Sequence, residues 1–255
     1  MATQVGTKLK ILFKVLQPGC VATNDWLENY GISRNLQKYY LKSGWLESIG
    51  RSAYKKPGDN VEWQGALSSI QKQTKTLVHV GGLSALSLEG FSHYFRLNNE
   101  PLHLFTPLQT KLPKWFKSNS WGLELQHHLS SFLPPGIGLK EQKVKQISIT
   151  VSSPERAMME CLLLAPQKMD LVECYQIFEG LVNLKPKLVN ELLVACNSVK
   201  VKRLFLYMAE KSGHQWFQFL KTNQIDIGKG NRMIEKNGIH VSKYLISIPK
   251  ELADF

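Results

Sequence analysis

The sequence predicts an α+β protein: an N-terminal winged helix-turn-helix, then a mixed α/β domain with a helical, bundle-like half and a terminal hairpin. Residues 21–57 follow the order helix, tight turn, helix and short basic hairpin. Apolar residues alternate over residues 144–151, as in a strand, and recur at helical spacing from Ser153 onward. We therefore expect a winged-helix core over residues 1–60, within a module that extends to about residue 95, and a C-terminal domain over residues 96–255.

The N-terminal module is predicted to open with a short amphipathic helix. Five apolar residues fit one face of that helix: Val5, Leu9, Leu12, Val15 and Leu16. Lys10 and Lys14 interrupt the apolar run that a secretion signal requires, and no small-residue cleavage site follows. The segment is therefore expected to be the first helix of the winged unit.

Cap residues mark the two helices of the helix-turn-helix. Thr23 suits the N-cap of the first one, and Gly31 can take the left-handed conformation that ends it. Ser33 then caps the second helix, which starts at Arg34 and ends at Gly44. Two capped helices joined by a tight turn are the signature of this motif.

The second of these helices is the candidate for contacting DNA. Leu36, Tyr39, Tyr40 and Ser43 cluster on one side of it, at about 100° per residue. The other side and its flanks hold polar side chains that can contact base edges or phosphates in a major groove. These candidate DNA-binding residues are Ser33, Arg34, Asn35, Gln37, Lys38 and Lys42.

A basic wing is predicted to follow. Residues 45–49 and 53–56 have the composition of two short strands, joined through Gly50 and Arg51. The wing adds three candidate phosphate contacts: Arg51, Lys55 and Lys56. The alternative is a small helical domain whose polar face is simply solvated. Turn chemistry, helix polarity and the wing agree with one another, and this agreement favours DNA binding.

The charge of the chain is compatible with that interpretation. The sequence has 32 Lys and Arg against 20 Asp and Glu, a net charge of +12. Nine of the basic residues and four of the acidic ones lie in residues 1–60. A basic protein attracts polyanions whatever their sequence, so the charge is consistent with nucleic acid binding and does not identify a site.

Beyond the wing, the pattern becomes that of a mixed domain. Helices are predicted over residues 62–73 and 82–89, and strands over residues 77–80, 102–105 and 144–151. The stretch before the last strand is rich in aromatic residues and proline, and it predicts loops and short hairpins.

The C-terminal half is predicted to be mostly helical. Ser153 caps a helix that begins with Pro154, and three further helices follow at about residues 169–180, 186–196 and 199–211. A hairpin between residues 232–235 and 244–248, turning at Asn237-Gly238, is expected to close the chain.

No metal site, cofactor or membrane span is predicted. The four cysteines are too few and too dispersed for a disulfide scaffold. Cys161, Cys174 and Cys196 lie within helical apolar patterns and are expected to be buried, reduced thiols of a cytoplasmic protein. His127 and His128 are adjacent, so they point apart and make a poor metal pair. The sequence contains no run of eighteen apolar residues that could span a membrane.

One enzymatic alternative remains. Glu141-Gln142-Lys143 has the spacing of a restriction-like nuclease site, in which the acid binds a metal and the lysine steadies the attacking water. Such a site also needs an upstream aspartate, and none occurs between Asp59 and Asp170, although Glu124 could substitute. The favoured interpretation is a protein that is not an enzyme.

Several short motifs match a known family. In the first module they are Gly31-Ile32-Ser33, Ser43-Gly44-Trp45-Leu46 and Gly50-Arg51-Ser52-Ala53-Tyr54. Further along they are His79-Val80-Gly81-Gly82, Ser153-Pro154-Glu155-Arg156, Lys200-Val201-Lys202-Arg203 and Lys243-Tyr244-Leu245. On these motifs the chain resembles, almost end to end, the AbiEi family of antitoxins of type IV toxin–antitoxin systems. Asn237-Gly238 stands where the family usually has a glycine pair, which leaves the predicted hairpin intact.

The resemblance implies two roles. The winged helix would repress the protein's own operon by binding inverted repeats in double-stranded promoter DNA, with two copies pairing on the DNA. The C-terminal domain would counteract a nucleotidyltransferase-like toxin, and a direct complex with that toxin is not assumed. The alternative is a stand-alone winged-helix regulator whose C-terminal domain binds an effector or forms oligomers.

A basic cluster in the C-terminal domain has two interpretations. Lys200, Lys202 and Arg203 lie on one predicted helix beside the apolar residues Leu204 and Met208. The simpler interpretation is a buried helix with a solvated basic edge. The other is a second surface patch that faces nucleic acid or the toxin.

Overall fold

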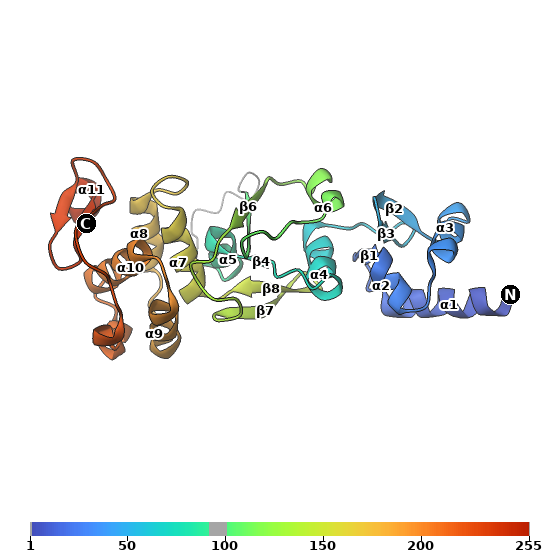
Figure 1. Cartoon of the computed structure of the whole chain (residues 1–255), viewed down its shortest axis with the longest axis horizontal. Helices are drawn as coiled ribbons and strands as arrows, with labels where there is room; N and C mark the ends of the chain where they lie inside the picture. Colours follow the sequence, from blue (N-terminus) through green and yellow to red (C-terminus); the bar gives the residue numbers. More distant parts are fainter. Residues whose placement is uncertain (1, 92–100, 255) are drawn as a thin grey trace. The chain divides into compact units, whose positions relative to one another are not determined.

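The computed structural model describes residues 2–91 and 101–254 (Figure 1). The chain forms two compact units. The first contains residues 1–78, 109–125 and 141–150, and the second contains residues 79–108, 126–140 and 151–255. Both units contain helices and strands, which confirms the predicted α+β class.

The first unit has the element order predicted for a winged helix-turn-helix. Its first elements are α1 (Ala2–Val15), β1 (Ala22–Thr23), α2 (Asn24–Asn29), α3 (Arg34–Lys42), β2 (Glu47–Gly50) and β3 (Ala53–Lys55). The strands β2 and β3 form the expected antiparallel hairpin. The short strand β1 was not predicted; it pairs with β3 and completes a sheet of order β1-β3-β2.

Glycine and serine caps define the helix ends in this unit. Gly31 and Gly44 have φ of 71° and 72°, as predicted for the residues that end α2 and α3. The Ser33 hydroxyl accepts a hydrogen bond from the backbone N–H of Leu36 and caps α3. Thr23 occupies the N-cap of α2 without a side-chain capping bond, so its predicted capping contact is wrong.

A small apolar core holds the helices of the first unit together. Its fully buried side chains include Leu12, Leu27, Ile32, Tyr40 and Leu46. The predicted inward face of α1 is confirmed at Leu12, whereas Val5 lies outside the side chains that the structure describes.

Helix α4 (Trp63–Gln73) is fixed to the strand β1 within the same unit. The Gln73 side chain accepts a hydrogen bond from Thr23 N at 3.0 Å and donates one to Val21 O at 2.6 Å. At Gly65, a Cβ would lie 1.8 Å from the carbonyl oxygen of Gly19, so only glycine permits this close approach. The short helix α6 (Lys114–Ser118) also belongs to this unit.

A five-stranded sheet has the order β6-β5-β4-β8-β7. Its strands are β4 (His79–Val80), β5 (Leu102–Thr106), β6 (Leu125–Leu129), β7 (Leu139–Val144) and β8 (Ile147–Ser152). The strands β6 and β7 were not predicted. Both contain many polar residues and are only partly buried, so their apolar alternation is weak.

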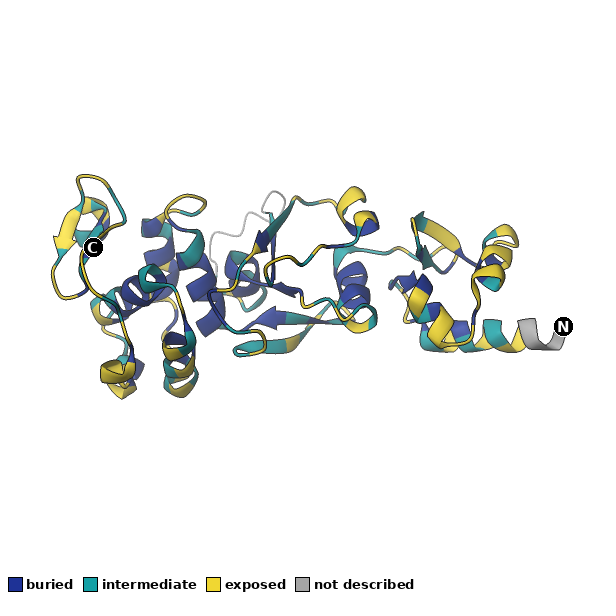
Figure 2. Cartoon of the chain, viewed as in Figure 1, coloured by how far each residue is buried: buried dark blue, intermediate teal, exposed yellow. Residues whose placement is uncertain are grey.

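The remaining helices of the second unit agree closely with their predicted positions. They are α5 (Gly82–Leu88), α7 (Pro154–Leu164), α8 (Leu171–Glu179), α9 (Pro186–Ala195) and α10 (Val199–Lys211). Three short helices that were not predicted follow: the 3-10 helices η1 (Gln215–Phe219) and η2 (Thr222–Gln224), and α11 (Lys250–Asp254). Figure 2 shows that α7 is buried over most of its length. Pro154 starts α7 as predicted, but Ser153 makes no side-chain capping bond.

The C-terminal strands pair differently from the prediction. The antiparallel hairpin joins β10 (Ile239–Val241) to β11 (Ile246–Ile248), with its turn after residue 241. The strand β9 (Arg232–Met233) lies on the other side of β11 and pairs with it in parallel. The predicted hairpin between residues 232–235 and 244–248 is therefore wrong. Asn237, with φ of 60°, instead lies in the connection from β9 to β10.

Candidate nucleic-acid interface

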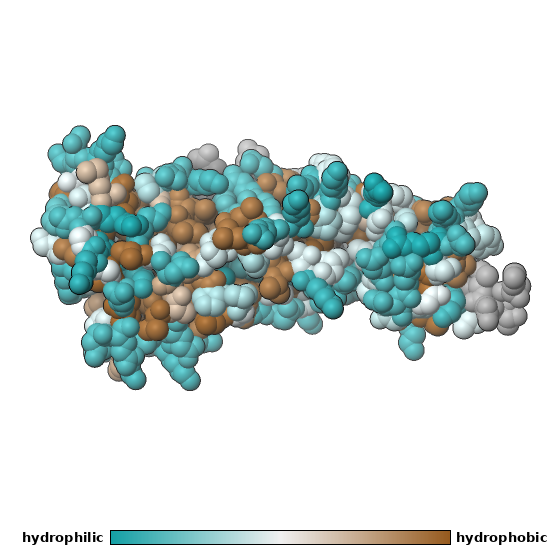
Figure 3. Space-filling view, viewed as in Figure 1, coloured by the Kyte–Doolittle hydropathy of each residue, from teal (hydrophilic) through white to brown (hydrophobic). Residues whose placement is uncertain are grey.

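The outer face of α3 presents polar and basic side chains to solvent. Asn35, Lys38 and Lys42 are exposed there, and Ser33 is exposed at the start of the helix. No acidic residue occurs in α3. Figure 3 shows a mainly hydrophilic surface over this part of the chain on the face in view.

Gln37 does not belong to this outer face. Its side chain is 1% exposed, and its Nε2 donates hydrogen bonds to the carbonyl oxygens of Asn24 at 3.2 Å and Ile32 at 2.9 Å. Tyr39, expected on the inner face, is 53% exposed. The inner face of α3 is therefore centred on Gln37 and Tyr40, and the predicted DNA-facing position of Gln37 is wrong.

Arg34 is exposed, but its charge is already paired. Its guanidinium contacts Asp25 at 2.7 Å and Glu28 at 2.8 Å, both on α2. The hydrogen bond to Glu28 raises the pKa of Arg34 above its ordinary value. A contact from Arg34 to DNA would have to compete with these two carboxylates.

Two of the three basic residues in the hairpin are occupied by other contacts. Lys56 is buried; its Nζ donates to the carbonyl oxygen of Phe13 at 3.1 Å and lies 5.5 Å from the centre of the Phe13 ring. Lys55 pairs with Glu47 at 3.0 Å and donates to the carbonyl oxygen of Asp59. Arg51, in the hairpin turn, is exposed. The predicted phosphate-facing position of Lys56 is therefore wrong, whereas Arg51 remains available.

The basic cluster on α10 is not a surface patch. Lys202 is 7% exposed and Arg203 is 1% exposed, and Lys200 is half-buried. The Nζ of Lys200 donates to the carbonyl oxygens of Leu163 and Ala165, and burial lowers the pKa of Lys200. The prediction of an exposed patch at Lys200, Lys202 and Arg203 is therefore wrong, and so is that of a solvated edge at Lys202 and Arg203.

The acidic residue of the nuclease-like motif, Glu141, is hydrogen-bonded to the neighbouring strand of the sheet. Both carboxylate oxygens of Glu141 accept hydrogen bonds, from Ser148 at 2.6 Å and from Thr150 at 2.8 Å. Within residues 2–91 and 101–254, no group of three His, Cys, Asp or Glu side chains could hold a metal ion. None of the helices in these described residues combines the length and the apolar character that spanning a bilayer requires.

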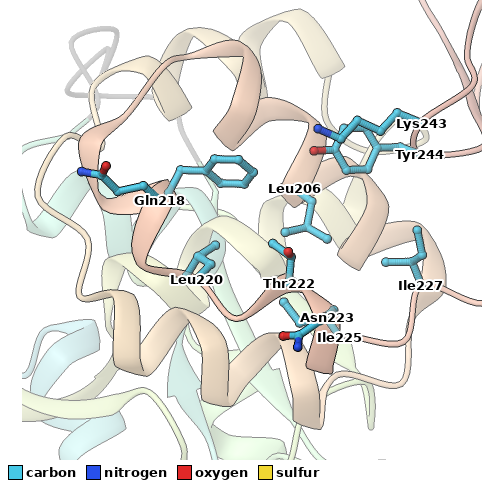
Figure 4. A pocket seen from close by; sticks show the side chains of 10 residues that line it. Leu206, Gln218, Leu220, Thr222, Asn223, Ile225, Ile227, Lys243 and Tyr244 are labelled. Carbon is cyan, nitrogen blue, oxygen red and sulfur yellow. The ribbon is translucent and has the colours of Figure 1, made fainter.

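Figure 4 shows a hollow of about 560 Å³ in the second unit. Leu206 from α10, Leu220 and Ile225 line it with apolar surface. Lys243 and Tyr244 lie at one side and both contact Glu210, to which the Tyr244 hydroxyl donates at 3.0 Å. Gln218, Thr222 and Asn223 add polar groups to the lining. The hollow is therefore of mixed polarity, and Glu210 balances the charge of Lys243 at its edge.

Two family matches together span almost the whole chain. Residues 5–97 match the family described as "Transcriptional regulator, AbiEi antitoxin N-terminal domain". Residues 99–249 match "Transcriptional regulator, AbiEi antitoxin, Type IV TA system". The chain belongs to the AbiEi family.

The fold of this AbiEi protein is similar to that in the crystal structure of the RV2827C protein from Mycobacterium tuberculosis. The TM-score is 0.57 at 12% sequence identity, and the similarity covers 95% of this chain and 90% of the other. At that identity the likeness concerns the fold alone. No curated protein gives a significant match.

Two family motifs of this AbiEi protein meet at a buried carboxylate that the sequence analysis missed. Glu160 of α7 is fully buried and accepts hydrogen bonds from His79 Nε2, Gly82 N, Ser152 Oγ and Arg156 Nε, all between 2.8 and 2.9 Å. Burial alone would raise the pKa of Glu160, but His79 and Arg156 outweigh it, and the pKa lies below its ordinary value. The carboxylate therefore acts as a structural centre of the second unit.

The same carboxylate explains the glycines of the first motif. A Cβ at Gly81 would lie 2.2 Å from Glu160 Oε2, and Gly82 has φ of 53°. The backbone can therefore approach Glu160 closely only without a side chain at position 81. The family resemblance marked His79 and the two glycines as a motif, but gave no sign of their buried partner.

A buried histidine pair predicts a loss of stability in mild acid. His128 Nε2 lies 2.9 Å from His103 Nδ1, and burial, with His103 beside it, lowers the pKa of His128 to about 4. Because the unfolded chain takes up this proton near pH 6.5, stability is lost as the pH falls from about 6.5 toward 4. We expect His128 to account for about 2 kcal/mol of unfolding free energy lost between pH 7.5 and 5.

Urea unfolding of the whole chain at those two pH values measures the effect. We expect His128→Phe to lose much less stability on acidification than the unsubstituted protein. His240, which is exposed, provides the control, since His240→Gln should leave the loss unchanged. An equal loss in His128→Phe and the unsubstituted protein would contradict the prediction.

Proposed function

We propose that this AbiEi protein represses its own operon by placing α3 in the major groove of inverted repeats in its promoter. The exposed, acid-free outer face of α3, with Asn35, Lys38 and Lys42, is the observation that supports this best. Ser33 lies at the start of the same face, and Arg51 in the hairpin turn can contact a backbone phosphate. Two copies on an inverted repeat would bind more tightly than one because the second contact becomes intramolecular.

We further propose that the region downstream of about residue 95 counteracts a nucleotidyltransferase-like toxin. Membership of a family of type IV antitoxins supports this role. The second candidate is a stand-alone regulator that binds an effector, and the hollow beside Leu206 and Tyr244 favours it.

Co-expression distinguishes the two candidates. The protein is expressed from an unrelated promoter together with the product of the neighbouring gene, and growth is measured. We expect the antitoxin to restore growth, and we expect a Lys38→Ala/Lys42→Ala variant to do so equally well while it fails to repress a reporter of its own promoter. No rescue by the unsubstituted protein would exclude the antitoxin role and leave the regulator. Loss of rescue in the variant would show that DNA binding is part of neutralisation.

A further inference from the structure

A cleft of about 660 Å³ opens within the first unit, next to the hairpin turn. It is bounded by the start of α2, the turn of the β2–β3 hairpin, the end of α4 and the start of α6. Four exposed cations line it: Arg34 and, one from beside each of the last three elements, Arg51, Lys75 and Lys114. Its acidic residue is Asp25, which pairs with Arg34 in the same lining. The cleft therefore has an excess of positive charge.

The walls of the cleft are held together by specific contacts. Asn119, directly after α6, donates from Nδ2 to the carbonyl oxygen of Ile49 in β2 at 2.7 Å. At Gly50, a Cβ would lie 2.7 Å from Trp115 Cβ, so the hairpin packs closely on α6. Together with the bonds of Gln73 to β1, these contacts place the cations at fixed backbone positions. A preorganised set of cations binds an anion at lower entropic cost than mobile ones.

The floor of the cleft contains buried polar atoms that lack partners. Thr23 and Asn24 line the cleft and are each 8% exposed. Among the described residues, neither Thr23 Oγ1 nor Asn24 Oδ1 has a hydrogen-bond partner. Buried polar groups are satisfied in most folded proteins, and an unsatisfied one points to a missing water or ligand. The Thr23 hydroxyl can donate a hydrogen bond to a phosphate oxygen, whereas Asn24 Oδ1 can only accept one and therefore gives no support for an anion.

We propose that this cleft binds a backbone phosphate of the DNA, held by Arg51, Lys75 and Lys114 and by the Thr23 hydroxyl. The inference rests on the proposed DNA binding through α3 and extends the contact to α4 and α6, outside the helix-turn-helix. Such contacts position a protein on the duplex without reading its sequence. Loss of the two lysines should therefore weaken binding to every DNA sequence by the same factor.

Binding of the full chain to its promoter fragment, and to a scrambled duplex of equal length, tests the proposal across a range of salt concentrations. For Lys75→Gln/Lys114→Gln we expect about tenfold weaker binding to both duplexes and, because one phosphate contact is lost, a slope of log affinity against log salt that is shallower by about 1. Lys111→Gln/Lys117→Gln is the matched control. These two lysines are exposed beside or within α6 but do not line the cleft, and their loss should change neither affinity nor slope appreciably.

The outcomes separate this inference from the proposed function. If Lys75→Gln/Lys114→Gln leaves promoter affinity and salt slope unchanged, the proposed phosphate contact in the cleft is overturned. DNA binding by α3 would still stand. An equal effect of the control pair would also overturn it, because the contribution would then be general charge. If the unsubstituted protein binds neither duplex, both proposals fail. Thermal unfolding with adenosine monophosphate tests a different ligand. If the nucleotide raises the melting temperature of the unsubstituted protein but not that of Lys75→Gln/Lys114→Gln, the cleft binds a free nucleotide and the proposed DNA contact is overturned.

Discussion

Replacing Lys38 and Lys42 with alanine is expected to reduce promoter affinity by about a hundredfold while leaving the fold intact. Each contact to a base edge is worth about 1–3 kcal/mol, and about 1.4 kcal/mol corresponds to a factor of ten. Both side chains are exposed on α3, so their loss removes no buried contact. Fluorescence anisotropy with a labelled promoter fragment measures the affinity, and thermal unfolding checks the fold.

Two neighbouring positions on α3 provide the contrast. Gln37→Ala should lower the melting temperature, because it removes two buried hydrogen bonds that join α3 to the start of α2 and to the turn. Arg34→Ala should have a smaller effect on affinity than the loss of Lys38 and Lys42, because Asp25 and Glu28 already pair with Arg34. Native affinity and native stability in Lys38→Ala/Lys42→Ala would mean that another surface contacts the promoter.

The helices and turns of the first unit could be predicted because their signals are local. The left-handed glycines at positions 31 and 44 end the two helices where the sequence placed them, and Ser33 caps α3 as expected. The inner face of α3 could not be predicted as well. The amide nitrogen of glutamine can donate two hydrogen bonds, so Gln37 can be buried where two carbonyl groups accept them. Those carbonyls belong to Asn24 and Ile32, and α3 alone gives no sign of them.

Basic residues were the least predictable part of the candidate site. Lysine and arginine can bury long stems and still satisfy their charged ends, as Lys56 does against Phe13. A count of positive charge therefore cannot separate cations that face solvent from cations that hold the fold together. The cleft was missed for a related reason: Arg51, Lys75 and Lys114 come from separate elements, and tertiary structure alone brings them together.

The C-terminal strands show the limit of turn signals. Asn237-Gly238 is a strong hairpin signal, and Asn237 does adopt a positive φ. The strand that follows this turn, β10, nevertheless pairs with β11 and not with β9. The strand β9 pairs in parallel with the other side of β11. A buried arginine contacts both segments, because its partners lie before β9 and in the turn before β11.

That arginine is Arg203, and its loss is expected to cost the second unit about 3–5 kcal/mol of unfolding free energy. Its Nε donates to the carbonyl oxygen of Ile227, and its Nη1 donates to those of Gly230 and Leu245, all at 2.8 Å. Arg203→Ala removes the donor to all three carbonyls, although Leu245 O still accepts a hydrogen bond from the backbone N–H of Arg232. We therefore expect lower stability in urea and faster proteolysis within residues 225–248.

The control is Lys187→Ala, at an exposed position of α9, where a change within about 0.5 kcal/mol is expected. The comparison also decides between a structural and a toxin-facing role for the basic cluster on α10. If Arg203 has a structural role, rescue from the toxin should fall only as far as the folded fraction of Arg203→Ala falls. A variant that keeps full stability and loses rescue would contradict this account, because the guanidinium would then act on a partner. The buried contacts to three carbonyls favour the first outcome, since a guanidinium that binds the C-terminal loops has little surface left for a partner.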